Sequence, residues 1–387
     1  MSLQIENVVE YDDALSFNIR GVETCVVNSL RRTCLSNIEC LVMKGFPHNE
    51  STINIIKNTT NFNNEYIKHR LSCIPIMKSD SSKFERYRES CKIVLDIRNQ
   101  KGSQENVYVT TEDIILVDKN TGTQTKDHDL FLRDPVSGDH ILICVLYPNH
   151  NINDDVIEEL VLEAEFEIGC AQENSCWNVV HNCTYEYLRN EPEIDKFANT
   201  IEDKMEKRDF EILDAQRIYY NNEYKVTLQS LGIFTNNEIM YKSCEYINNR
   251  LRYINSYAKD NELAKVPSKE EFIALATDGT KRTEELEDIQ NNYCNIYKDG
   301  EEFFVFELNE DDYTIGKLIE IYLYKYYKEV VDFVGFKKNH PVEPDVQIYI
   351  RFRNETENSQ LVFSMIKTTT ERLVEIFNTI QKSFISN

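Results

Sequence analysis

The fold of this chain is decided by the stretch Leu15-Ser16-Phe17-Asn18-Ile19-Arg20, which continues as Thr24-Cys25-Val26-Val27-Asn28-Ser29-Leu30-Arg31-Arg32. Its first part alternates apolar and polar residues, as a half-buried strand does, and its second part has helical spacing. A second stretch repeats the pattern with a strand from Phe303 to Leu308 and a helix opened by Asp311-Asp312-Tyr313-Thr314-Ile315-Gly316-Lys317-Leu318-Ile319-Glu320. Both stretches predict a short strand, a turn and a helix.

Each of these two units has one apolar face that is too small to support a domain alone. The economical arrangement is for the two units to pack against each other, as a dimer built within one polypeptide. The predicted fold is therefore α+β, with two strand-helix dimerisation modules and a β-rich insert domain. The side chains expected in the intramolecular dimer interface are Val27, Leu30, Cys34, Ile315, Leu318, Leu373 and Phe377.

The composition is that of a globular protein. The 387 residues are 41% hydrophobic and 28% charged, which excludes disordered and fibrous classes. The formal net charge of -23 argues against independent binding to DNA or RNA, because affinity for phosphates comes mainly from Lys and Arg, although a local basic patch remains compatible with it. No apolar run approaches the length that crosses a bilayer, so no membrane contact is expected.

The eleven cysteines include no C-x-x-C pair, and the N-terminal residues lack a signal-peptide pattern. We therefore expect free thiols in a reducing compartment. The nearest approach to a metal cluster is Cys170, Cys176, His181 and Cys183, whose spacing lacks the close Cys pair of most structural zinc sites. No metal or cofactor is expected. No G-x-G-x-x-G, P-loop, H-E-x-x-H or nucleophile elbow is present, so no catalytic residues are predicted.

The order of elements predicts four regions. Residues 1–42 and 165–255 form the first module, 43–164 the insert, 256–300 a polar connector and 301–387 the second module. In the insert, a helix from Asn64 is stopped by Pro75, and short strands follow between Cys91 and Tyr147. The segment after Trp177 is expected to be charged and helical to about residue 213. A capping box then opens a helix at Thr235 and Glu238. The tail is expected to form a final amphipathic helix, with Ile366, Leu373, Phe377, Ile380 and Phe384 on its apolar face.

Several motifs resemble one family, the α-like assembly subunits of cellular RNA polymerases. The run Asn28-Ser29-Leu30-Arg31-Arg32 with Leu35-Ser36 is similar to the first-helix motif of the bacterial α subunit and of the third-largest subunit of polymerase II. His69-Arg70-Leu71 with Ile74-Pro75-Ile76 resembles the next motif, although Ser72-Cys73 replaces Gly-Leu. The later matches follow in the family's order: Val109 to Ile114, Ile141 to Ile143, Glu165 to Gly169, and Trp177.

The C-terminal part resembles the smaller partner of that family, called L in archaea and the eleventh subunit in polymerase II. Thr314-Ile315-Gly316 opens its helix, and Val331 to Phe336 precede His340-Pro341-Val342-Glu343-Pro344. Lys317 and Glu320 depart from the family, which has Asn and Arg there. These partners are usually separate chains, and their fusion resembles the arrangement in large nucleocytoplasmic DNA viruses.

The resemblance implies a noncatalytic assembly platform of a DNA-directed RNA polymerase, present once per complex. It implies binding to the β-like second-largest subunit, then to the largest subunit, and to a small tenth-subunit-like protein, with no direct nucleic-acid contact. A viral source implies the host cytoplasm and the virion; any other source implies an intracellular reducing compartment. The alternative function is an α+β interaction adaptor of another complex.

The residues implied in partner contacts are Asn28, Arg31, Arg32, His69, Arg70 and Glu343. Arg32 lies about 200° around the helix from Leu30, so it is expected to point away from the pseudo-dimer core. A solvated arginine is the alternative interpretation. For His69 and Arg70 a structural role in the insert is equally compatible, and Trp177 is expected to be a packing anchor.

Overall fold

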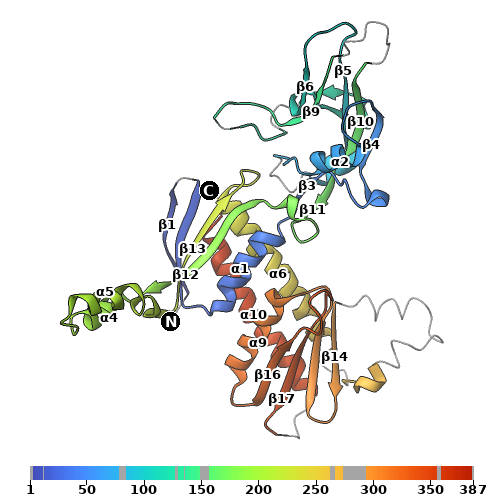
Figure 1. The fold of residues 1–387 in the computed structure, drawn as a ribbon. Helices are drawn as coiled ribbons and strands as arrows, with labels where there is room; N and C mark the ends of the chain where they lie inside the picture. Colours follow the sequence, from blue (N-terminus) through green and yellow to red (C-terminus); the bar gives the residue numbers. More distant parts are fainter. Residues whose placement is uncertain are drawn as a thin grey trace. The chain divides into compact units, whose positions relative to one another are not determined.

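The structure, a computed structural model, describes residues 3–11, 13–77, 84–126, 130–134, 136–148, 157–261, 266–272, 293–354 and 359–385. The chain divides into two compact units (Figure 1). Unit 1 comprises Met1–Cys34, Cys183–Leu228 and Met240–Asn387, and unit 2 comprises Leu35–Asn182 and Gln229–Ile239. Both units mix helices with antiparallel sheets, which confirms the α+β class. The predicted insert, 43–164, lies within unit 2.

The first sheet of unit 1 has the order β1-β2-β13-β12. Its strands are β1 (Gln4–Tyr11), β2 (Ala14–Arg20), β12 (Val180–Arg189) and β13 (Tyr219–Ser230). The alternation predicted for β2 is confirmed, because Leu15, Phe17 and Ile19 are buried while the residues between them are partly exposed. β2 leads into α1 (Thr24–Ser36), so the first predicted strand-helix unit is present.

The second sheet of unit 1 has the order β14-β15-β17-β16. Its strands are β14 (Cys294–Asp299), β15 (Phe303–Leu308), β16 (Val331–Lys337) and β17 (Val346–Phe352), all antiparallel to their neighbours. β15 leads into α9 (Tyr313–Tyr327), as predicted, and α10 (Ser359–Lys382) follows β17. The predicted amphipathic helix of the tail is thus confirmed, with Ile366, Leu373, Phe377, Ile380 and Phe384 all buried along it and just beyond its end.

Gly316 allows β16 to approach α9 closely. A Cβ atom at this position would lie only 2.3 Å from Cε2 of Phe336, on β16. The backbone N–H of Phe336 donates to Oε1 of Glu320 at 3.1 Å, and Lys317 pairs with Glu320 and lies 5.2 Å from the Phe336 ring. The two residues that depart from the family motif therefore attach β16 to α9.

Helices α1, α6 (Asn236–Asp260), α9 and α10 meet in the centre of unit 1 (Figure 1). The capping box that opens α6 is confirmed: the Thr235 N–H donates to the Glu238 carboxylate at 2.8 Å, and the Glu238 N–H donates to Thr235 Oγ1 at 3.3 Å. One face of α6 is fully buried through Met240, Cys244, Ile247 and Leu251. No helix among the described residues has the length and apolar character needed to cross a membrane.

Unit 2 contains a five-stranded sheet of order β4-β10-β5-β7-β8, with two smaller pairs, β6-β9 and β11-β3. The elements are β3 (Cys40–Val42), β4 (Ile53–Asn58), α2 (Asn64–Ser72), α3 (Phe84–Ser90), β5 (Cys91–Arg98), β6 (Val107–Thr110), β7 (Ile115–Asp118), β8 (Gln124–Thr125), β9 (Leu142–Leu146), β10 (Glu159–Glu165) and β11 (Glu167–Gly169). Short 3₁₀ turns lie at His48–Glu50, Thr111–Asp113, Ser175–Trp177 and, in unit 1, Ala215–Arg217. The predicted helix from Asn64 and the short strands of the insert are confirmed.

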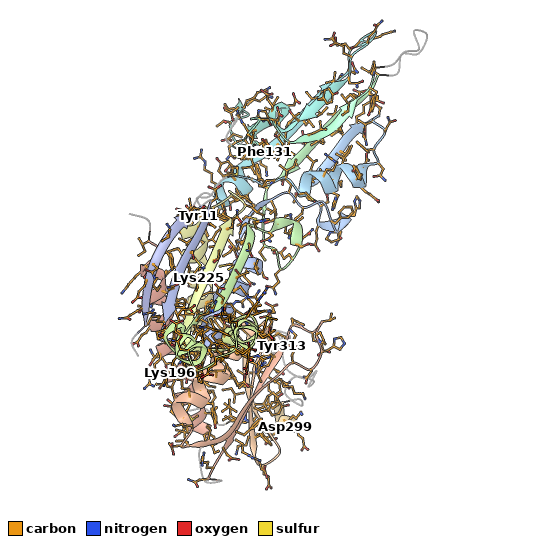
Figure 2. All side chains as sticks on the ribbon, turned by 60° about the vertical axis from the view of Figure 1, so that its left-hand side comes forward. Tyr11, Phe131, Lys196, Lys225, Asp299 and Tyr313 are labelled. Atoms are coloured by element: carbon orange, nitrogen blue, oxygen red, sulfur yellow. The ribbon has the colours of Figure 1, made fainter. Side chains whose placement is uncertain are left out.

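The prediction of a continuous charged helical segment to residue 213 was wrong. Strand β12 occupies its first part, and α4 (Glu191–Ala198) and α5 (Lys204–Ile212) follow; Lys196, labelled in Figure 2, lies on α4. In β12 only Val180 and Cys183 are buried, because this edge strand has few side chains on the inner face. Because β12 lacks a regular alternation of apolar and polar residues, its sequence did not predict a strand. Strands β1 and β13 were not predicted either.

The predicted connector, 256–300, overlaps elements of both modules. α6 continues to Asp260, and β14 begins at Cys294 as an edge strand of the second sheet. Within the connector, Ser268 forms a parallel bridge with Lys298, and the Phe272 ring stacks on Tyr297 with 5.0 Å between centroids. Residues 262–265 and 273–292 lie outside the described residues.

We expect Gly316→Ala to lower the free energy of unfolding by about 1 to 3 kcal/mol, because the added methyl group overpacks the contact with Phe336. The measurement is urea denaturation. The double variant Gly316→Ala/Phe336→Leu should lose less than the sum of the two single variants, because a smaller side chain relieves the clash. Strict additivity of the two changes would contradict this account of Gly316.

Candidate functional site

Helices α1 and α9 pack antiparallel and are joined by polar contacts at both ends. At one end the Arg32 guanidinium forms an ion pair with the Asp312 carboxylate, and its Nε donates to Thr314 Oγ1 at 3.1 Å. At the other end Glu23 pairs with Lys325. Between them the Ser29 hydroxyl donates to the Thr314 carbonyl at 2.9 Å. These contacts join the first module to the second.

The expectation that Arg32 points away from the pseudo-dimer core was wrong. The angle of about 200° was measured from Leu30 alone, as if a single flank of α1 met the other module. In unit 1, Cys34 contacts Met240 and Ser243 of α6, with its Sγ 3.0 Å from Ser243 Oγ, whereas the flank that carries Arg32 meets the start of α9. Because two flanks of α1 are covered, Arg32 contributes to the intramolecular pairing.

Asp312 has a second role as the N-cap of α9. Its side chain accepts from the Thr314 N–H at 2.8 Å, which satisfies one of the free donors at the start of the helix. Burial of the carboxyl works to raise its pKa, but the hydrogen bonds from Thr314 and the charge of Arg32 hold the pKa below the usual value. Asp312 is therefore ionised and paired at neutral pH.

Helices α6 and α10 also pack against each other through buried polar groups. The Asn248 Nδ2 donates to Asn378 Oδ1 at 3.0 Å, and the Asn255 Nδ2 donates to the Lys367 carbonyl and to Thr370 Oγ1, each at 3.0 Å. Asn248 and Thr370 are almost fully buried. Near the end of α10, the Phe384 ring contacts Phe17 of β2 edge to face at 5.0 Å. These contacts add a second seam between the modules.

The side chains predicted for the dimer interface all lie in unit 1, and each is at most 1% exposed. They are Val27, Leu30, Cys34, Ile315, Leu318, Leu373 and Phe377. Their burial leaves one stripe of α1 partly accessible. Asn28 and Arg31 are half-buried on this stripe, and Arg31 Nε donates to Asn28 Oδ1 at 3.1 Å.

The two predicted contact residues of the insert differ in their surroundings. Arg70 donates to the Leu142 carbonyl at 2.7 Å and lies 5.8 Å from the Tyr66 ring, so it links α2 to β9. His69 is exposed, with Nε2 4.0 Å from the Cys73 Sγ. The packing role expected for Trp177 is confirmed: the side chain is 6% exposed, and its Nε1 donates to the Ser72 carbonyl at 3.1 Å.

The other predicted positions are Glu343 and the cysteine set. Glu343 is exposed in the turn between β16 and β17. Cys183 belongs to unit 1, whereas Cys170, Cys176 and His181 belong to unit 2. Within the described ranges, no three His, Cys, Asp or Glu side chains are grouped so that they could hold a metal ion. The absence of zinc stays a prediction.

A charged and aromatic cluster beside α6 was missed from the sequence. The Tyr293 hydroxyl donates to the Asp311 carboxylate, and the Arg250 guanidinium lies 4.9 Å from the Tyr293 ring. Burial raises the pKa of Asp311 to about 6, against the opposing effects of Tyr293, the Asp312 N–H and Arg250. Burial also raises the pKa of Tyr293, and the Asp311 charge adds to that rise. No spacing rule links Arg250 to Asp311, because 60 residues of sequence separate them.

The comparisons with known proteins give one family model and distant relatives that match parts of this chain. Residues 304–383, from β15 to α10, match the family model of the RNA polymerase Rpb3/Rpb11 dimerisation domain. The DNA-directed RNA polymerase subunit Rpo3 of Methanosphaera stadtmanae is 25% identical over 185 residues, which cover 48% of this chain and 61% of that subunit. A conjugation stage-specific protein of Tetrahymena thermophila is 26% identical over 211 residues, 50% of this chain and 61% of that protein. The chain thus spans about three fifths of the length of these relatives.

We expect Arg32→Ala to lower the free energy of unfolding by about 1 kcal/mol, because a partly exposed ion pair with an added hydrogen bond is worth roughly that much. A double-mutant cycle with Asp312→Asn, which keeps the oxygen that caps α9, should give a coupling of about 0.5 to 1 kcal/mol. Arg31→Ala is the matched control and should leave stability within about 0.5 kcal/mol. A zero coupling would show that the pair does not join the helices.

The two neighbouring carboxyls should give opposite pH dependences. Because the pKa of Asp311 is higher in the folded state, its protonated carboxyl stabilises that state relative to the unfolded chain. This stabilisation is complete below pH 3.8, the usual pKa, and is lost as the pH rises through about 6. Relative to Asp311→Asn, the natural chain should therefore lose up to about 3 kcal/mol from about pH 4 to pH 7. Because the pKa of Asp312 is lowered in the folded state, its ionised carboxylate stabilises that state above pH 3.8, the usual pKa. This stabilisation is lost as the pH falls below that value. Urea denaturation of the Asp311→Asn variant from about pH 4 to pH 7, and of the Asp312→Asn variant from about pH 5 down to about pH 2, measures the two slopes, and slopes of the same sign would contradict the assignment.

Proposed function

We propose that this α-like RNA polymerase subunit, whose residues 304–383 form an Rpb3/Rpb11-type dimerisation domain, is the assembly platform of a multisubunit DNA-directed RNA polymerase. In this proposal it binds the β-like second-largest subunit first and the largest subunit next, with a small tenth-subunit-like protein, and it is present once per complex. The subunit supplies no catalytic residues, and phosphoryl transfer takes place on the partners.

The observation that carries the proposal is the pairing of two strand-helix modules within one chain. α1 contacts α9 and α6 contacts α10, so each module covers the apolar face of the other. Fusion makes this pairing intramolecular, with an effective concentration on the order of mM for a short flexible linker. Each copy of the chain then presents one complete surface for its partners.

The accessible stripe of α1 is the proposed site for the second-largest subunit. Asn28 and Arg31 are half-buried there, and the planar fork of donors on Arg31 suits carboxylate or carbonyl groups of a partner. Arg32 is a weaker candidate, since Asp312 and Thr314 already bind its donors. His69 and Glu343 are exposed and remain proposed contacts, whereas Arg70 contributes by fixing α2 against β9.

The fusion also supports a proposal about the source. Its likeness to the arrangement of large nucleocytoplasmic DNA viruses leads us to propose transcription of viral genes, with the polymerase in the host cytoplasm and in the virion. The second candidate, an interaction adaptor of another complex, uses the same paired modules but requires no polymerase subunits. Co-purification with the second-largest polymerase subunit separates the two.

The test is co-expression of the tagged chain with the second-largest subunit, followed by quantitative capture. Arg31→Ala should weaken capture at least tenfold, because losing one partner of a buried charged contact costs about 2 to 5 kcal/mol of binding. Its melting temperature should not change, because surface substitutions shift stability by less than about 0.5 kcal/mol.

Arg208→Ala, which removes an exposed arginine from α5, is the matched control and should bind normally. If the Arg31→Ala variant captures the second-largest subunit normally, the interface with that subunit does not lie on the accessible stripe of α1. Failure of the unsubstituted chain to capture the second-largest subunit would refute the platform function itself.

A further inference from the structure

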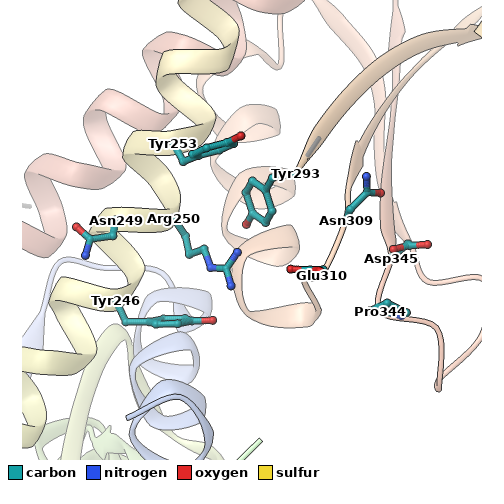
Figure 3. A pocket seen from close by; sticks show the side chains of 9 residues that line it. All are labelled: Tyr246, Asn249, Arg250, Tyr253, Tyr293, Asn309, Glu310, Pro344 and Asp345. Carbon is teal, nitrogen blue, oxygen red and sulfur yellow. The ribbon is translucent and has the colours of Figure 1, made fainter. Parts of the chain in front are cut away.

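A pocket of about 710 Å³ opens on unit 1 beside α6 (Figure 3). One wall comes from α6, through Tyr246, Arg250 and Tyr253. The other comes from the second module, through Tyr293 just before β14, Glu310 in the turn before α9, and Asp345 just before β17. Because the two walls belong to different modules, the pocket is complete only when the modules are paired.

The inner part of the pocket is lined by aromatic side chains and by one positively charged side chain, Arg250. The Tyr253 ring meets the Tyr293 ring edge to face at 5.3 Å, and Tyr253 is 53% exposed. The Arg250 guanidinium lies 4.9 Å from the Tyr293 ring and 5.6 Å from the Tyr246 ring. Figure 3 shows Arg250 extending from α6 toward Glu310. The exposed Tyr253 ring and the half-buried guanidinium of Arg250 are thus available in this wall of the pocket.

The opposite wall carries carboxylates. Neither Glu310 nor Asp345 forms a hydrogen bond or an ion pair in the part of the chain that the structure describes. Glu310 has a φ of +57°, a conformation that glycine or asparagine adopts at lower cost. With Asp311 behind Tyr293, carboxyl groups outnumber the single guanidinium of Arg250, so the pocket favours a cationic occupant.

We propose that this pocket binds a lysine or arginine side chain on an extended segment of another polymerase subunit, an inference that rests on the proposed function. The cation lies between Glu310 and Asp345, its aliphatic stem packs on the exposed Tyr253 ring, and a backbone carbonyl of the segment accepts from Arg250. The net charge of -23 also attracts a basic segment. Because both modules build the pocket, this partner binds the paired platform and not a separate module.

The test is site-specific photo-crosslinking in the polymerase assembled from co-expressed subunits. A photoreactive p-benzoylphenylalanine replaces Asn249, an exposed residue on the rim of the pocket, and crosslinked peptides are identified by mass spectrometry. We expect crosslinks to one subunit segment that carries Lys or Arg next to the crosslinked residue. The double variant Glu310→Gln/Asp345→Asn should reduce the yield at least fivefold, and Glu301→Gln, outside the pocket, should leave it unchanged.

A further variant separates binding from folding. Glu310→Gly removes the carboxylate and relieves the positive φ, so its melting temperature should be unchanged or higher while its crosslinking yield falls. Crosslinks that persist in the double variant, or that map to an acidic segment or to nucleic acid, would overturn the proposal while leaving the platform function intact. A polymerase that assembles but gives no crosslink from position 249 would also overturn the pocket proposal and leave the platform function intact. If the unsubstituted chain does not assemble with the other subunits, both proposals fail.

Discussion

The structure of unit 1 depends on the mutual burial of two apolar faces. Each module contains one four-stranded antiparallel sheet and two long helices, and the helices of the two modules contact each other, α1 with α9 and α6 with α10. The side chains at the seam, such as Leu30, Leu318 and Phe377, are at most 1% exposed. Burial of this kind contributes about 1.5 to 3 kcal/mol for each large aliphatic or aromatic side chain. Neither module can gain that contribution when it is alone.

Apolar burial has no direction, so the polar contacts decide which way the helices run. The two ion pairs at the ends of the α1–α9 contact fit an antiparallel orientation only. In a shifted arrangement Asn248 and Asn378 would lose their hydrogen bond, and each buried polar group left without a partner costs about 1 to 3 kcal/mol. The pairing of the modules is therefore driven by apolar surface and specified by a few polar side chains.

Local patterns in the sequence were sufficient for the elements that bury one full face. Strand β2, the capping box of α6 and the apolar stripe of α10 were predicted because alternation, capping and helical spacing are properties of neighbouring residues. Strand β12 was not, since its few buried side chains leave no alternation to read. Arg32 was misplaced because a helical wheel locates one contact face and α1 has two. The Arg250–Asp311 cluster depends on tertiary contacts alone.

The insertion of unit 2 into the first module has a consequence for biosynthesis. β2 ends at Arg20 and pairs on one side with β1, which precedes it, but its neighbour on the other side, β13, begins only at Tyr219. At a translation rate of about 5 to 20 residues per second, roughly 10 to 40 s pass before the ribosome has made this second neighbour of β2. During that interval, in which most of unit 2 is synthesised, the apolar faces of β2 and α1 lack the cover that later segments of unit 1 provide. A nascent chain in this state exposes apolar segments of the kind that chaperones bind, and its native cover is complete only when the second module has been synthesised.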